Sequence, residues 1–241
     1  MTFIRSLIFN AVFFGTSIPI VLLLTLTLPF PRPVLKKGLE LWMHWMVLSL
    51  RLFAGLSIEV RGRENIPDGA AVFASKHQSA WDTGVFFVLT ADPAYVLKKE
   101  LLHIPFYGWL LRKDGMVAID RSAGASALKQ MVRDSRRILG EGRQLVIFPE
   151  GTRSAPGSKQ PYHPGIAAIY KQTDAPVVPV ALDSGLYWAR RSFIKKPGAI
   201  VIEFLQPMEP GMDRKTFMRE LERRVEEKTD GLIAEATTGR G

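Results

Sequence analysis

The chain has 241 residues, enough for one domain of moderate size with an additional segment and too few for a large multidomain protein. Hydrophobic residues make up 47% and charged residues 23%, which supports a buried core and excludes a wholly disordered chain. Lys and Arg outnumber Asp and Glu by 32 to 23, which favours an anionic partner such as a nucleic acid, a phosphorylated molecule or a lipid surface. The absence of Cys excludes disulfides, thiolate nucleophiles, zinc–cysteine sites and iron–sulfur clusters.

The amino-terminal segment is strongly apolar. The 26 residues between Arg5 and Arg32 carry no charge, and at about 1.5 Å per residue they are long enough to cross a hydrocarbon core of about 30 Å. The segment is longer than the core of a typical signal peptide, and three prolines follow it where a cleavage site of small residues would stand. We therefore expect it to be retained and to contact lipid.

Two arrangements of this segment are compatible with the sequence. Gly15, Ser17 and Pro19 favour a kink, so a re-entrant hairpin in one leaflet competes with a straight span. For a span, more positive charge follows the segment (Arg32, Lys36, Lys37) than precedes it, which predicts that the remainder faces the cytoplasm. A hairpin predicts the same side for the remainder.

A second apolar segment covers residues 39–56. Glu40, His44 and Arg51 disfavour a full span, and Trp42 and Trp45 suit the headgroup region of a bilayer. An amphipathic helix at the membrane interface is our preferred interpretation, and an ordinary core helix is the alternative. We therefore expect residues 1–56 to form membrane-anchoring helices and residues 57–241 to form a separate domain.

In this second part, short β-branched runs alternate with helical patterns. Strands are predicted at 58–61, 71–75, 95–97, 116–119, 145–148, 177–181 and 199–204. Helices are predicted at 83–89, 101–111, 125–139 and 164–172, with a last, structural helix at 213–228 that begins at the capping residue Asp213. The pattern predicts an α/β fold with a mixed, largely parallel sheet flanked by helices, and places a functional site at the carboxyl ends of the strands.

His77 and Asp82 are the first candidate pair, because they follow the predicted strand 71–75 directly. On a continuous helix, side chains five residues apart would point about 140° away from each other, so a turn is needed to join them. Joined in this way, Asp82 would fix the imidazole tautomer while the other ring nitrogen takes a proton from a substrate hydroxyl. A loop histidine beside a helix-capping aspartate is the alternative, and this pair alone does not exclude it.

Three further elements contain polar groups or an apolar wall near strand ends. The first ends in Arg121, a side chain suited to two-pronged contact with phosphate. The second combines Glu150, the permissive Gly151 and a second such side chain, Arg153, after an apolar strand. The third, 175–182, is apolar and contains two prolines, which suits either a core strand or the wall of a lipid groove. Each element taken alone also fits an ordinary strand terminus.

Taken in order, the four elements strongly resemble the glycerolipid acyltransferase family, and within it the bacterial 1-acylglycerol-3-phosphate acyltransferases. The resemblance covers residues 57–182 and includes the H-x-x-x-x-D block at 77–82, the Asp-Arg block at 115–121, the F-P-E-G-T-R-S block at 148–154 and the V-P-V strand at 178–180. Two positions depart from the family pattern. Lys76 stands where many members have Asn, and Ala118 stands where many have Phe.

The resemblance implies transfer of a fatty acyl group from a thioester to the hydroxyl of 1-acyl-sn-glycerol 3-phosphate, giving phosphatidic acid. It makes His77 the general base and Asp82 its orienting partner, and it assigns substrate binding to Arg121, Glu150, Gly151, Thr152 and Arg153. It implies acyl-CoA or acyl carrier protein as donor, a lysophospholipid acceptor, membrane lipid as a partner and no cofactor. From the residues themselves, the lack of an H-E-x-x-H motif or carboxylate cluster predicts no metal, and the lack of a helix-turn-helix, RRM, KH or zinc-finger signature predicts no nucleic acid. The resemblance also implies location at the cytoplasmic (inner) membrane with the catalytic domain facing the cytoplasm.

Independently, the lack of Cys and of a G-x-S-x-G elbow favours direct transfer without a covalent intermediate. Three alternatives remain open: the same chemistry on a lyso-ornithine lipid or glycerol 3-phosphate, a non-catalytic membrane-anchored lipid-binding module, and a hydrolase with Ser79 or Thr83 as nucleophile. Direct transfer requires His77, Asp82, Arg121 and Arg153 to converge on one cavity, which we expect to open toward the amino-terminal helices.

Overall fold

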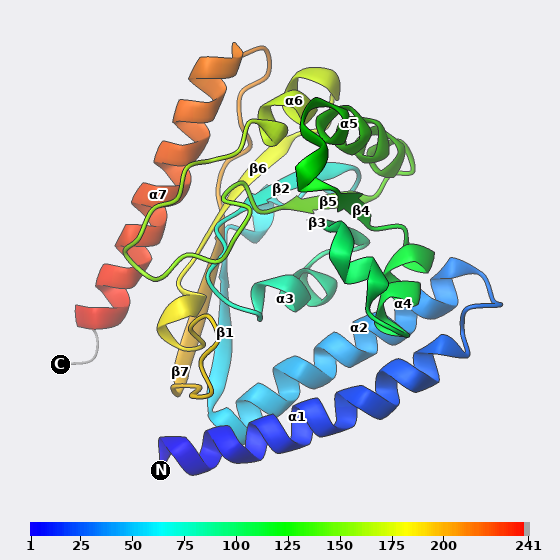
Figure 1. Ribbon diagram of the computed structural model, residues 1–241. Coiled ribbons are helices and arrows are strands. Elements are labelled where there is room, and N and C mark those ends of the chain that lie inside the picture. The colour runs from blue at the N-terminus through cyan, green and yellow to red at the C-terminus, as the bar shows by residue number, and fades with distance from the viewer. Residues whose placement is uncertain (239–241) are drawn as a thin grey trace.

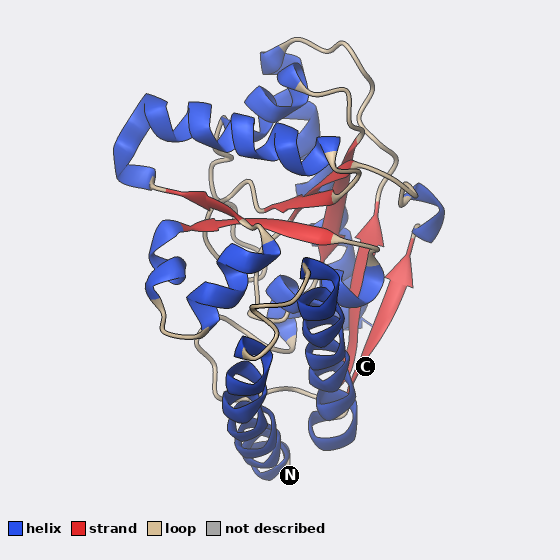
Figure 2. Ribbon diagram, turned by 90° about the vertical axis from the view of Figure 1, so that its right-hand side faces the viewer, coloured by secondary structure: helices blue, strands red, loops and turns tan. Residues whose placement is uncertain are grey.

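The computed structural model describes residues 1–238 and contains a seven-stranded sheet in the order β1-β7-β6-β2-β5-β3-β4 (Figure 2). The strands are β1 Leu56–Arg61, β2 Ala71–Ser75, β3 Pro93–Lys98, β4 Val117–Ile119, β5 Gln144–Ile147, β6 Val177–Leu182 and β7 Gly198–Phe204. Neighbouring strands pair in parallel except β6 and β7, which are antiparallel. The predicted mixed, largely parallel sheet is therefore confirmed.

Helices cover both faces of the sheet (Figure 1). They are α1 Thr2–Thr25, α2 Arg32–Ser49, α3 Asp82–Leu89, α4 Tyr107–Asp114, α5 Gly124–Gly140, α6 Gly165–Gln172 and α7 Arg214–Thr238, with short helices η1 Leu50–Ala54, η2 Arg63–Asn65, η3 Lys99–His103, η4 Arg121–Ala123 and η5 Ser184–Leu186. In β2, Phe73 belongs to the core shared with α1, α2 and α3, and its neighbours Val72 and Ala74 belong to the core shared with α5, α6 and α7. Because β2 alternates between two apolar cores, its end is rigidly placed.

The amino-terminal helices form an antiparallel hairpin along one side of the molecule (Figure 1). α1 continues through Pro19, and the chain reverses only between α1 and α2. The chain therefore does not reverse at Gly15, Ser17 and Pro19, as a hairpin within this segment would require, and the reversal uses the proline-rich turn that follows α1. α2 packs in turn against α3 and α4, so the hairpin is attached to the α/β domain.

The two tryptophans of α2 bond to α1. The indole N–H of Trp42 donates to Ser17 Oγ at 3.0 Å, and that of Trp45 donates to Thr16 Oγ1 at 2.9 Å. Both hydroxyls lie in the middle of α1. An indole N–H needs an acceptor when it is half-buried, so these bonds fix the register of α1 against α2.

The outer face of the hairpin is apolar and exposed. Among the described residues, one helix, Thr2–Thr25, is long and apolar enough to cross a membrane, and 17% of its most apolar window is buried. Large apolar side chains are exposed along α1, including Phe3, Leu7, Phe14, Ile18 and Leu23. A continuous exposed apolar surface of this kind indicates membrane association.

Two predicted helices differ from the structure. The predicted helix 101–111 is divided into η3 and α4, because Pro105 lacks the N–H for a helical hydrogen bond and the next residue, Phe106, takes a positive φ of 63°. The last helix begins as predicted: Oδ1 of Asp213 accepts the N–H groups of Lys215 and Thr216 at 2.8 and 3.1 Å. However, α7 extends to Thr238, ten residues beyond the predicted end, and Leu232 continues its buried face.

Candidate active site

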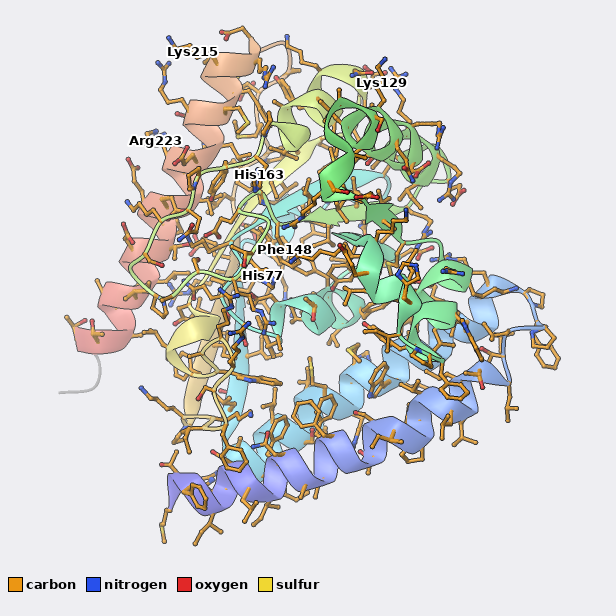
Figure 3. All side chains as sticks on the ribbon, in the orientation of Figure 1. His77, Lys129, Phe148, His163, Lys215 and Arg223 are labelled. Carbon is orange, nitrogen blue, oxygen red and sulfur yellow. The ribbon has the colours of Figure 1, made fainter. Side chains whose placement is uncertain are left out.

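The polar elements identified in the sequence meet because β2 and β5 are parallel neighbours, with Ala74 paired to Ile147. His77 follows the end of β2, and the turn that begins at Phe148 follows the end of β5. Carboxyl ends of parallel strands lie at one edge of a sheet, so these two segments leave it side by side. Figure 3 shows His77, Phe148 and His163 together near the centre of the molecule, whereas Lys129, Lys215 and Arg223 point outward.

A turn joins His77 to Asp82, the first residue of α3. The Nδ1–H of His77 donates to Oδ2 of Asp82 at 2.9 Å. The same oxygen accepts the N–H groups of Gln78 and Ser79 at 2.7 and 2.8 Å, which fixes the turn as well as the carboxylate. With Nδ1 occupied as a donor, Nε2 of His77 is the ring nitrogen able to accept a proton.

The aspartate is fully buried and the histidine is not. Asp82 is 0% exposed, whereas 12% of the His77 side chain is exposed. Oδ1 of Asp82 accepts the hydroxyl of Ser184 at 2.6 Å. A buried carboxylate that accepts several hydrogen bonds stays in one orientation, so the imidazole has a fixed partner on one side and access to solvent on the other.

The ring of His77 is also held on one face. It stacks on Phe148 with the ring centroids 4.0 Å apart and an angle of 16° between the planes. Phe148 in turn stacks on Tyr95, with centroids 6.3 Å apart. Stacking and the bond to Asp82 together restrict both rotation and tilt of the imidazole.

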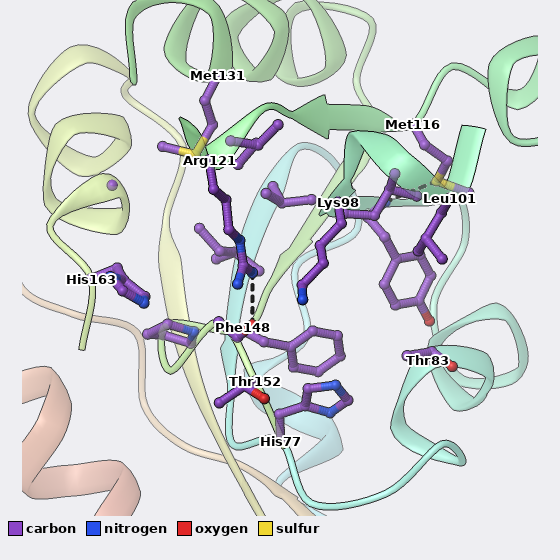
Figure 4. Close-up of a pocket in the computed structure, with 18 of the residues that line it drawn as sticks. His77, Thr83, Lys98, Leu101, Met116, Arg121, Met131, Phe148, Thr152 and His163 are labelled. Carbon is purple, nitrogen blue, oxygen red and sulfur yellow. Dashed lines mark hydrogen bonds between the residues drawn. The ribbon is translucent and has the colours of Figure 1, made fainter. Parts of the chain in front are cut away.

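His77 opens into a cavity of about 720 Å³. Four predicted substrate-binding residues, Arg121, Gly151, Thr152 and Arg153, line it together with His77. A guanidinium N–H of Arg121 donates to the carbonyl oxygen of Gly151 at 2.7 Å, as Figure 4 shows. The bond ties the end of β4 to the turn after β5, so Arg121 and Arg153 line the same cavity as the imidazole of His77.

Two predicted site residues do not line this cavity. Asp82 lies behind His77. Glu150, predicted to bind substrate, has a fully buried side chain that bonds inward, to Lys76 and to the backbone N–H of His77. Burial raises the pKa of Glu150 and the nearby Lys76 ammonium opposes that shift. The geometry therefore places Glu150 as a support of His77 rather than as a substrate contact.

All residues that line the cavity lie between His77 and Arg191 in the sequence, and no described residue of α1 or α2 is among them. The opening toward the amino-terminal helices stays a prediction. Tyr107 of α4 lines the cavity and contacts Trp42 of α2, with ring centroids 6.3 Å apart.

Comparison with known proteins identifies the family. The acyltransferase family model matches residues 57–183, more than half of the chain. The chain belongs to the acyltransferase family. This acyltransferase is 36% identical over 208 residues to the 1-acyl-sn-glycerol-3-phosphate acyltransferase of Pseudomonas aeruginosa, covering 86% of the chain and 80% of that protein.

Two other proteins extend the comparison. A 1-acyl-sn-glycerol-3-phosphate acyltransferase from Limnanthes alba is 32% identical over 191 residues, covering 78% of this chain and 66% of the plant protein. The crystal structure of the 1-acyl-sn-glycerophosphate acyltransferase PlsC from Thermotoga maritima aligns with a TM-score of 0.79 at 22% identity. That alignment covers 97% of this chain and 98% of the Thermotoga chain, so the two share one fold.

Sequence reasoning missed several residues of the acyltransferase site. Lys98, His163, Arg190 and Arg191 also line the cavity, and Ser184 holds Asp82. Lys98 is the last residue of β3, a parallel strand of the sheet. The rule that functional residues lie at the carboxyl ends of such strands, which located Arg121, would also have located Lys98. The other four residues lie in loops and a short helix, and no local sequence pattern marks them.

The remaining wall of the cavity is apolar. Its side chains include Phe87, Tyr95, Leu101, Leu111, Met116 and Met131. In Figure 4, Arg121 and Lys98 point toward Phe148 and His77, while Met116 and Leu101 lie to one side. A cavity with a cationic part and an apolar part is suited to an amphiphile.

The geometry does not favour the hydrolase alternative. Ser79 is fully buried, and its hydroxyl accepts the N–H of Trp81. Thr83 lines the cavity, but its hydroxyl donates to the carbonyl oxygen of Ala80 at 2.7 Å. Neither hydroxyl is bonded to His77, as an activated nucleophile would be.

Proposed function

We propose that this acyltransferase transfers a fatty acyl group from a thioester to the free hydroxyl of 1-acyl-sn-glycerol 3-phosphate, producing phosphatidic acid. The observation that carries the proposal is the cavity in which the Asp82-bound imidazole of His77 lies with Arg121 and Arg153. The names of the Pseudomonas and Limnanthes relatives support the choice of acceptor.

In the proposed reaction, His77 acts as the general base. Nε2 takes the proton of the acceptor hydroxyl as its oxygen attacks the thioester carbonyl carbon. The carbon–sulfur bond then breaks, and the imidazolium returns the proton to the departing thiolate. Asp82 stabilises the transient imidazolium through the Nδ1–H bond. These steps produce an ester and a free thiol. They need no covalent enzyme intermediate, and they use the thioester as co-substrate with no further cofactor.

The cations of the cavity divide between two anionic substrates in this proposal. Arg121 and Arg153 bind the acceptor phosphate, because a guanidinium contacts phosphate with two parallel N–H groups. Gly151 and Thr152 shape the turn between them. The exposed Arg190 and Arg191, in the loop after η5, also line the cavity, and Arg190 donates to the carbonyl oxygen of Arg153 at 3.5 Å; they suit the phosphates of an acyl-CoA or acyl carrier protein donor.

The hairpin of α1 and α2 supports a location of this site at a membrane. We propose that the enzyme is attached to the cytoplasmic face of the inner membrane by the exposed apolar side of α1. Acceptor and product are amphiphiles, so catalysis at the interface avoids transferring either of them fully into water.

An acceptor panel with the purified protein in lipid vesicles tests the proposal. We expect the highest kcat/KM with 1-acyl-sn-glycerol 3-phosphate, and we expect His77→Ala to lower kcat by about 10² to 10⁴. His103→Ala, which changes an exposed histidine of η3, is the matched control and should be fully active. Best turnover on a lyso-ornithine lipid or on glycerol 3-phosphate would overturn the acceptor, and full activity of His77→Ala would overturn the mechanism.

A further inference from the structure

A buried charge cluster lies behind the His77–Asp82 pair and joins β2 to α7. The ammonium of Lys76 contacts both carboxylate oxygens of Glu226 at 2.8 and 2.9 Å and Oε2 of Glu150 at 3.2 Å. The side chains of Lys76 and Glu150 are 1% and 0% exposed, and that of Glu226 is 6% exposed. The hydroxyl of Tyr162 donates to Oε1 of Glu226 at 3.0 Å. Three ionisable side chains from distant parts of the sequence therefore form one buried unit.

The cluster reaches the backbone of His77 through Glu150. While Oε2 of Glu150 binds Lys76, Oε1 accepts the backbone N–H of His77 at 3.1 Å. On the other side, the backbone N–H of Ser154 donates to the carbonyl oxygen of His77 at 2.8 Å. Both main-chain polar groups of His77 are thus held by the turn after β5, and one of these bonds depends on the orientation of the Glu150 carboxylate.

The orientation of Glu150 depends in turn on Lys76. A lysine ammonium is flexible, and burying it is costly unless it is paired. Glu226 supplies the closest carboxylate, with both oxygens on the ammonium, and Tyr162 fixes that carboxylate. Without Glu226 the ammonium would lose its two shortest contacts and keep Glu150 and the carbonyl oxygen of Ser158, at 3.3 Å, so its position against Glu150 would be less well defined.

We propose that Glu226 of α7 is a positioning residue for acyl transfer, which acts through Lys76 and Glu150 on the placement of the His77 imidazole. The proposal rests on the proposed role of His77 as the base. It gives α7 a part in catalysis, although Glu226 itself does not touch the substrate.

Glu226→Gln tests the proposal directly, because the amide keeps the size of the side chain and removes its charge. We expect kcat, corrected for the folded fraction measured by circular dichroism, to fall about 10- to 100-fold. KM for both substrates should stay within about twofold, since the substrate contacts are intact. An unchanged kcat, or a loss that appears only in KM or only in the folded fraction, would overturn the proposal.

Asp230→Asn is the matched control. Asp230 lies one turn further along α7 and pairs with Lys159 at 3.1 Å, so it also ties α7 to the loop after the β5 turn. That pair is about half exposed, and within the described part of the chain it makes no hydrogen bond or ion pair with Glu150 or His77. If attachment of α7 were the only requirement, Asp230→Asn and Glu226→Gln would behave alike. We expect Asp230→Asn to keep the wild-type kcat, and an equal loss in both variants would count against positioning.

A double variant keeps the test informative if Glu226→Gln folds poorly. Lys76→Met with Glu226→Gln removes the ammonium together with its closest carboxylate, and the Glu150 carboxylate keeps its bond from the backbone N–H of His77. If the two residues act as a pair, the kcat of the double variant is no lower than that of the more damaged single variant. Losses that multiply, or a folded double variant with wild-type kcat, would overturn the proposal.

His77→Ala, measured alongside, distinguishes a failure of the proposed function from a failure of the role of Glu226. Transfer retained in His77→Ala removes the proposed function and this inference with it. Transfer lost in His77→Ala but unchanged in Glu226→Gln and in the double variant removes only the role of Glu226.

Discussion

Ser184 donates its hydroxyl to Oδ1 of Asp82 at 2.6 Å across 102 positions of sequence. Ser184 begins η5, the short helix that follows β6, and it is fully buried. The bond joins the end of β6 to the beginning of α3 at the carboxylate that orients His77. The His77–Asp82 pair is therefore held by residues that follow three strands, β2, β5 and β6.

Removing this hydroxyl should lower activity. Ser184→Ala deletes one of the hydrogen bonds to a buried carboxylate, and a bond to a charged group contributes at least about 1.5 kcal/mol. We expect kcat to fall about tenfold, since about 1.4 kcal/mol corresponds to one factor of ten. Steady-state kinetics on 1-acyl-sn-glycerol 3-phosphate measure this loss. Ser57→Ala, which changes an exposed serine at the sheet edge, should match wild type, and equal rates in the two variants would refute a role for Ser184.

The stacking of His77 on Phe148 makes a second prediction. Phe148→Leu keeps an apolar side chain but removes the flat face 4.0 Å from the imidazole. Aromatic pairs contribute about 0.5 to 1.5 kcal/mol beyond their buried area, so we expect kcat to fall about 2- to 12-fold. Phe148→Tyr retains the ring and should retain most of the rate. A Tyr variant as slow as the Leu variant would show that the stack does not set the rate.

Gly151 offers a test of the proposed phosphate site. It has φ of 64°, and a Cβ there would lie 2.9 Å from Cδ2 of His163 and 3.2 Å from Nη2 of Arg121. Gly157 has a similar φ of 75°, but nothing lies within 4 Å of its Cβ position. Gly151→Ala and Gly157→Ala therefore share the backbone penalty and differ in crowding.

We expect only Gly151→Ala to raise KM for the acceptor, by about tenfold, because a displacement of about an ångström at a binding side chain is enough for such a loss. Initial rates at varied acceptor concentration measure the difference. Equal KM values in the two variants would mean that Arg121 does not contact the acceptor from its present position.

The sheet was predictable because each of its strands carries its own local signal. The β-branched runs placed all seven strands to within a few residues, and their alternation with helices defined the fold class. The division of 101–111 into η3 and α4 and the ten additional residues of α7 were not predicted. Those boundaries depend on packing and on the strained backbone at Phe106, which periodicity does not report.

Within the site, prediction depended on sequence distance. His77 and Asp82 are five residues apart, so a single turn was enough to suggest their contact. Ser184 and Glu226 meet that turn from 102 and 150 positions away, and only the completed fold brings them there. Glu150 shows a different limit of prediction: the F-P-E-G-T-R-S motif that contains it was recognisable in the sequence, but the direction of its side chain was not. Residue type and spacing identify a site, whereas long-range packing decides which side chains face the substrate.

Asp114, the last residue of α4, provides a prediction about pH. It is fully buried, with Oδ1 3.0 Å from Nε of Arg32 at the start of α2 and Oδ2 3.9 Å from Nη2 of Arg143 before β5. Burial raises the pKa of Asp114 from 3.8 to about 6, although both arginines oppose the shift. Asp114 thus lies where the amino-terminal hairpin joins the α/β domain, and its ionisation acts on that junction.

The sign of the pH effect follows from proton binding. Between about pH 4 and pH 6 the folded state binds more protons at Asp114 than the unfolded state, so ionisation lowers the free energy of unfolding as pH rises through this window. Asp114→Asn cannot ionise. Relative to wild type, its free energy of unfolding should therefore increase by about 2 kcal/mol between pH 4 and pH 7, at 1.36 kcal/mol per pKa unit. Urea unfolding of both proteins in the same detergent measures this difference, and titrations common to both cancel in it. A difference that stays constant with pH, or that decreases, would contradict the raised pKa of Asp114.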